Sequence, residues 1–154
     1  MINFKAGEIF MKQDKRYVTI KLDTTIEDEG EIEYNTIKQM GQFFNKGKLD
    51  VLIYEEEHED GATIKNLITI HPNKVNIKRS GLITMNQQFI LNKSTETYYE
   101  HPHGQLHMET HTDSITYKSI ATDQVQLRIV YRVKINGMEE RKHVLELTYK
   151  ENAK

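Results

Sequence analysis

Four of the chain's seven histidines lie within eleven residues, at His101, His103, His107 and His111. Imidazole nitrogens and carboxylates bind zinc, iron and nickel, and Glu109 stands between the last two histidines. In a strand His107, Glu109 and His111 would share one face but spread over about 13 Å, so at most two could reach one ion. A metal-dependent enzyme using this segment is therefore the weaker interpretation.

The opposite face of the same segment carries Leu106 and Met108, which are better candidates for an interior. We therefore expect the histidines to face solvent. We predict no metal and no other cofactor for the chain.

Two polar residues fall where alternation places them among apolar neighbours. Arg79 follows Val75 and Ile77 at spacings of two, and Gln87 lies between Met85 and Phe89 in the same way. A guanidinium in a barrel interior could bind a carboxylate or phosphate head group. The alternative is that Arg79 pairs with an internal glutamate or with backbone carbonyls near residues 80–81. Tyr99, Tyr131 and Tyr149 could line the same interior, although tyrosines at strand spacing usually serve packing.

Several catalytic classes are excluded by composition. The absence of cysteine rules out disulfides, thiolate zinc sites and cysteine nucleophiles. No nucleophile elbow, phosphate loop or dinucleotide fingerprint occurs. We therefore expect no enzyme.

The 154 residues carry a formal net charge of -2, so there is no positive field of the kind that drives nucleic-acid binding. No apolar run is long enough for a membrane helix, and the first residues lack the apolar core of a signal peptide. We expect a cytoplasmic protein without nucleic-acid or membrane partners. The oligomeric state is left open, with a homodimer as one alternative.

The candidate metal and ligand residues lie in short runs of β-branched and aromatic residues that are separated by Gly, Asn, Asp and Pro. The pattern predicts ten strands, at residues 16–26, 31–44, 49–57, 62–70, 74–81, 82–91, 95–101, 105–118, 125–135 and 141–150. Connections this short leave no room for crossover helices and require antiparallel pairing.

Such a sheet would leave long exposed edges unless it curls into a barrel or a sandwich. We predict an all-β domain over residues 16–154, a closed or nearly closed antiparallel barrel of eight to ten strands, and a preceding extension at residues 1–15. We expect bends or bulges at Gly41 and near Asp113, where the alternation of apolar and polar residues shifts by one position.

The last hairpin gives a testable register. Placing Leu145 and Leu147 on the same face as Leu127 and Ile129 requires pairing of Ile129 with Leu145 and of Leu127 with Leu147. The connection at Asn136 must then have three residues or be followed by a bulge.

The segment RSGLITMNQQF at 79–89, with IEDEGEIE, LIYEEE and LELTY elsewhere, resembles the YwiB-like family of small bacterial proteins of unknown function. The resemblance covers roughly residues 16–150. It implies a calycin-like barrel, similar to lipocalins, and the family has no established activity, cofactor or catalytic residues to carry over to this chain.

Two functions remain. The first is a non-enzymatic module that binds a small amphipathic or anionic molecule inside the barrel through Arg79, Gln87, Tyr99 and Tyr131. The second is a structural or protein-interaction domain with a filled core. A cavity above roughly 300 Å³ lined by Arg79 would favour the first.

Overall fold

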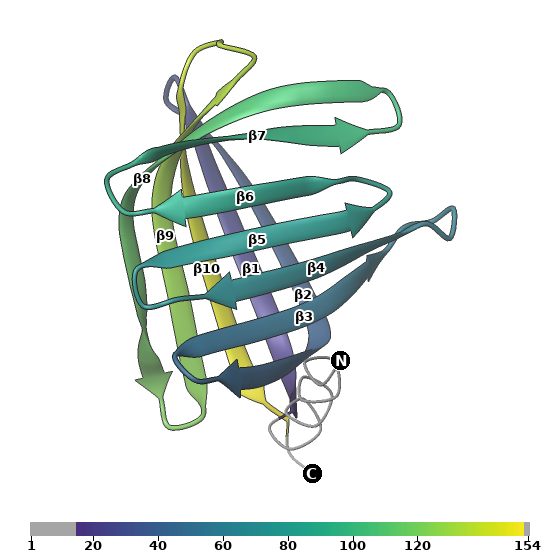
Figure 1. The fold of residues 1–154 in the computed structure, drawn as a ribbon, viewed down its shortest axis with the longest axis vertical. Coiled ribbons are helices and arrows are strands. Elements are labelled where there is room, and N and C mark those ends of the chain that lie inside the picture. Colours follow the sequence, from purple (N-terminus) through teal and green to yellow (C-terminus); the bar gives the residue numbers. More distant parts are fainter. Residues whose placement is uncertain (1–14, 153–154) are drawn as a thin grey trace, which may run out of the picture.

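The computed structural model describes residues 15–152, which form ten antiparallel strands (Figure 1). They are β1 (Arg16–Asp28), β2 (Glu31–Lys46), β3 (Leu49–Glu57), β4 (Thr63–Ile70), β5 (Lys74–Gly81), β6 (Met85–Ile90), β7 (Ser94–His101), β8 (Gly104–Ala121), β9 (Gln124–Ile135) and β10 (Arg141–Glu151). No helix that could cross a membrane occurs in this part of the chain.

All ten predicted strands are present. The sheet runs in the order β6-β5-β4-β3-β2-β1-β10-β9-β8-β7, so strands adjacent in sequence pair, apart from β6 and β7, and β1 pairs with β10. The predicted extension at residues 1–15 lies outside the described residues, apart from Lys15.

The barrel is nearly closed, at a seam between β6 on one side and β7 with β8 on the other. Within residues 15–152, two isolated backbone bridges cross this seam, Thr84 with Glu100 and Leu91 with Thr112. Thr84 and Leu91 flank β6, which is shorter than the predicted strand of 82–91, and they bridge to β7 and β8 instead of extending the ladder with β5. The predicted all-β, antiparallel, nearly closed barrel is confirmed.

Gly41 marks the corner between two groups of strands. Residues 31–40 of β2 pair with β1 alone, and pairing with β3 begins at Gly41. Beyond this corner β3 to β6 cross the direction of β1, β2 and β10 (Figure 1). A Cβ at Gly41 would lie 2.7 Å from the carbonyl oxygen of Ile53 and 2.6 Å from Cδ1 of Ile20, so the crossing requires glycine. The ladder passes this corner without a bulge.

The parity change near Asp113 is a β-bulge, as predicted. The pairing of β8 with β9 shifts between Thr112 and Ser114. Met108, Thr110 and Thr112 are turned inward before the bulge, and Ile115 and Tyr117 after it.

The predicted register of the last hairpin is confirmed, with Leu145 opposite Ile129 and Leu147 opposite Leu127. All four side chains are buried in the core. The connection between the two strands spans five residues, 136–140, rather than three, and the last pair of β9 with β10 is Val133 with Arg141.

The two ends of the described chain lie side by side. Val18 of β1 is opposite Glu151 of β10, and the amide of Asn152 donates to the carbonyl of Tyr17 at 3.0 Å. The barrel therefore continues without a break from its last strand to its first.

Candidate functional site

A cavity of about 290 Å³ lies inside the barrel, between the two crossing groups of strands. Six strands contribute two alternating residues each, because alternate side chains of a strand share a face. The lining consists of Leu22, Thr24, Asn35, Ile37, Tyr54, Glu56, Asn66, Ile68, Ile77, Arg79, Met85 and Gln87, with Tyr131 and Leu145. Its volume is just below the roughly 300 Å³ expected for a ligand-binding cavity.

The polar end of this cavity is a ring of three hydrogen bonds. Arg79 Nε donates to Asn66 Oδ1 at 3.0 Å, and Arg79 Nη2 donates to Glu56 Oε2 at 2.8 Å. Asn66 Nδ2 donates to the same Glu56 oxygen at 2.8 Å. Asn66 is fully buried, while the Arg79 and Glu56 side chains are 23% and 14% exposed. The guanidinium is thus turned inward and is held by an internal glutamate, the alternative partner considered from the sequence.

Gln87 also lines the cavity, but the nitrogen of its side-chain amide forms a hydrogen bond across the seam. Its Nε2 donates to Oγ1 of Thr110 at 2.9 Å, in a buried hydrogen bond from β6 to β8. Burying an amide without such a partner would cost free energy. This bond therefore helps to close the barrel, and it leaves the amide oxygen of Gln87 free of side-chain hydrogen bonds within residues 15–152.

Two tyrosines complete the wall of the cavity. Burial, reinforced by the nearby Glu56 carboxylate, raises the pKa of Tyr54 to about 12. Burial likewise raises the pKa of Tyr131 far above its ordinary range. Both hydroxyls are therefore neutral at physiological pH and can donate hydrogen bonds.

Comparisons with known proteins agree with this architecture. Residues 20–147 match the model of a family described as "Domain of unknown function (DUF1934)". The chain belongs to the DUF1934 family. It is 30% identical over 139 residues to the "Uncharacterized beta-barrel protein YwiB" of Bacillus subtilis (strain 168), covering 90% of this chain and 96% of that relative. The resemblance noted in the sequence is confirmed.

A crystal structure of the ywiB protein from Bacillus subtilis has the same fold. It superimposes with a TM-score of 0.78 at 27% identity, covering 90% of this chain and 94% of that structure. The DUF1934 barrel is therefore shared between the two proteins.

Of the four residues proposed as ligand contacts, Tyr99 is the one outside the lining of the cavity. It is half-buried on β7, with its ring 5.7 Å from that of His101. Tyr149 is also elsewhere, since its hydroxyl lies 2.6 Å from that of Tyr117, which donates to Asp50 at 2.6 Å. The DUF1934 cavity thus brings together Arg79, Gln87 and Tyr131.

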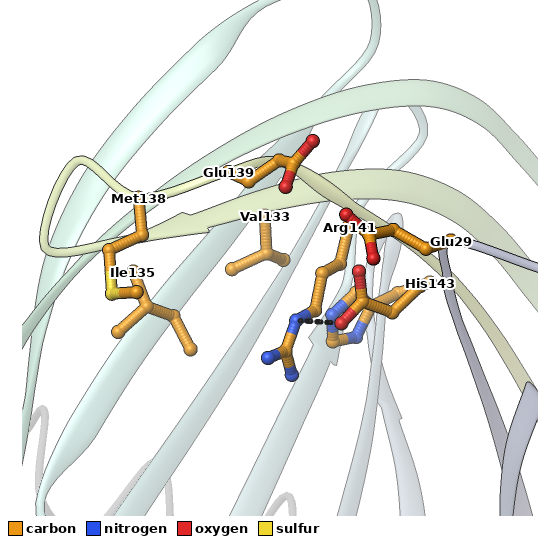
Figure 2. Close-up of a pocket in the computed structure, with 8 residues that line it drawn as sticks. Glu29, Val133, Ile135, Met138, Glu139, Arg141 and His143 are labelled. Carbon is orange, nitrogen blue, oxygen red and sulfur yellow. Dashed lines mark ion pairs between the residues drawn. The ribbon is translucent and has the colours of Figure 1, made fainter. Parts of the chain in front are cut away.

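A second cavity, of about 330 Å³, opens at the end of the barrel between the β1–β2 turn and the β9–β10 connection. Figure 2 shows Val133, Ile135 and Met138 on one side, and Arg141 beside His143 on the other. Arg141 Nε lies 3.3 Å from a carboxylate oxygen of Asp28. Glu29 and Glu139 add two carboxylates at the rim.

His143 lines the second cavity and was not among the residues predicted from the sequence. Its ring stacks on that of Tyr131, with centroids 5.0 Å apart. Burial, together with the charge of Arg141, lowers the pKa of His143 to about 4. Its parity with Leu145 and Leu147 could have identified it, because residues at spacings of two share a face.

The histidine segment lies on the outer surface of the DUF1934 barrel. His107 Nε2 is 2.7 Å from Glu96, and His111 Nδ1 is 2.9 Å from the hydroxyl of Ser94. No group of three histidine, aspartate or glutamate side chains within residues 15–152 is arranged to hold a metal ion.

Proposed function

We propose that the chain is a non-enzymatic binding module whose barrel interior holds a small amphipathic or anionic molecule. The observation that carries this proposal is the internal cavity, where a half-buried guanidinium faces an apolar wall. Ligand sites characteristically combine mostly apolar lining with a few convergent polar groups. Here Ile37, Ile68 and Leu145 supply the apolar wall, and Arg79 and Gln87 supply the polar anchors.

The size of the cavity limits the ligand. A volume of about 290 Å³ is just below the usual range for ligand cavities, so the molecule must be small. The cavity borders Asn35, an exposed residue on the part of β2 that has no partner on its β3 side. We take this unpaired edge as the route by which the molecule enters.

The polar side chains of the cavity bind the molecule without a catalytic step. Glu56 accepts two hydrogen bonds through one oxygen and balances the charge of Arg79. Tyr54 and Tyr131 hold their protons at neutral pH. These side chains are suited to holding a molecule in place.

Two measurements test the proposal. Native mass spectrometry of freshly purified protein should show extra mass that is lost on acid denaturation, and it also reports the number of subunits. Independently, 1-octanol should produce saturable NMR chemical-shift changes at backbone amides around Ile68 and Ile77, which line the cavity.

Two variants locate the binding. Thr24→Phe should abolish the octanol response because Thr24 lines the cavity, whereas Thr25→Phe, one residue along β1 and on its other face, should retain it. If no mass is carried and octanol leaves the wild-type spectrum unchanged, the barrel is a filled structural or protein-interaction domain and the proposal is wrong.

A further inference from the structure

The charges at the polar end of the cavity already balance. Arg79 and Glu56 form an ion pair at 2.8 Å, and Asn66 bonds to both of them. An unpaired guanidinium would attract anions, but the guanidinium of Arg79 is paired with the carboxylate of Glu56, and a ligand would meet both groups. The cavity therefore offers no net positive charge.

Both members of the ion pair keep unused hydrogen-bonding capacity. Glu56 uses Oε2 in this network, and no side-chain hydrogen bond within residues 15–152 engages its Oε1. Arg79 uses the hydrogen of Nε and one of Nη2, which leaves the two hydrogens of Nη1 and the second hydrogen of Nη2. A ligand thus meets a strong acceptor and a strong donor on neighbouring groups.

A carboxylate and a carboxamide would fare differently here. A carboxylate would satisfy Arg79 but would place a second negative charge beside Glu56, where burial makes like-charge repulsion strong. A carboxamide of nearly the same shape can accept from Arg79 with its oxygen and donate to Glu56 with its nitrogen. Both protein groups are then satisfied.

We infer that the bound molecule has an uncharged planar head group with adjacent donor and acceptor atoms, of the carboxamide or ureido class, on a short apolar body. This inference rests on the proposed function, because it assigns the chemistry of the same cavity. It narrows the amphipathic or anionic class to neutral head groups.

Three probes of equal chain length test it: octanamide, octanoate and octylamine, titrated by isothermal calorimetry against the full chain at pH 7. Octanamide should bind at least about tenfold tighter than either charged probe, a difference of about 1.4 kcal/mol. Octanoate binding as tightly as octanamide or tighter overturns the inference and leaves the binding module intact. Absence of binding by all three, together with no octanol response, defeats the proposed function itself.

The variant Glu56→Gln gives a second and independent readout. It keeps the shape of the side chain but removes the negative charge, so it should raise the affinity for octanoate by about tenfold or more and invert the order of the two probes. Glu146→Gln is the matched control, because Glu146 pairs with Arg128 on the outer face at 3.3 Å. An unchanged order in Glu56→Gln contradicts the inference, and the wild-type comparison holds even if this variant folds poorly.

Discussion

At the scale of single residues, the cavity owes its polar character to a few polar side chains that lie on the inward face of strands among apolar ones. Arg79 and Gln87 could be predicted from their spacing because the period of a strand is two. Their partners could not, since Glu56 lies two strands from Arg79 on β3 and Thr110 lies across the seam from Gln87 on β8, and no local pattern specifies which residues of separate strands come together.

His143 provides a prediction of pH dependence. Its pKa of about 4 in the fold is below its ordinary value of 6.5, so the unfolded chain binds the proton more tightly. The stabilisation from this residue is therefore complete above pH 6.5 and is lost as the pH falls toward 4. Urea unfolding should show a loss on the order of 1 to 3 kcal/mol across that window in the wild type.

The loss should be smaller in His143→Phe, which keeps the stacked ring on Tyr131 without a titrating group. His103→Gln is the control, because His103 is exposed on the β7–β8 turn. Equal pH dependence in the wild type and in His143→Phe would show that this imidazole is not responsible.

At the scale of elements, each strand could be predicted from the sequence, whereas the places where the strands bend could be predicted only in part. Gly41 could be assigned to a corner because an isolated glycine in a strand pattern indicates a close backbone approach. The turn between β8 and β9 spans only residues 122–123, which is shorter than the predicted connection of 119–124, because β8 continues to Ala121 and β9 begins at Gln124.

Gly41→Ala should be strongly destabilising. The added Cβ would lie 2.7 Å from the backbone oxygen of Ile53, so β2 and β3 must separate at the corner. We expect a loss of about 2 to 3 kcal/mol in urea unfolding, as for other overpacked sites. Gly47→Ala is the comparison. A Cβ at Gly47 would meet open space, so the only cost is the positive φ of 62°, which should lower the free energy of unfolding by about 1 kcal/mol. A smaller loss for Gly41→Ala than for Gly47→Ala would contradict the close approach.

At the scale of the whole molecule, closure is uneven around the barrel. Every neighbouring pair from β6 through β1 to β7 is joined by a ladder, whereas the residues that flank β6 meet β7 and β8 through isolated bridges. The sequence predicted near-closure because long edges promote association. It could not locate the seam, because the residues that form it look like ordinary ends of strands.

Hydrogen exchange should reveal this seam. Amides of Gln87 and Gln88 on β6 should exchange faster than those of Leu145 and Leu147 on β10, because fewer hydrogen bonds must break to expose them. NMR exchange rates at pH 7 would test the order. Equal protection of the two strands would mean that the seam opens only when the entire barrel unfolds.

The adjacency of Tyr17 and Asn152 means that the chain has no inherent first strand. A gene that joined these ends with a short peptide and began instead at Gly137, in the exposed β9–β10 connection, would preserve every ladder of the barrel. Such a circular permutant would start and finish beside the second cavity, which makes that opening a natural place to attach a reporter domain.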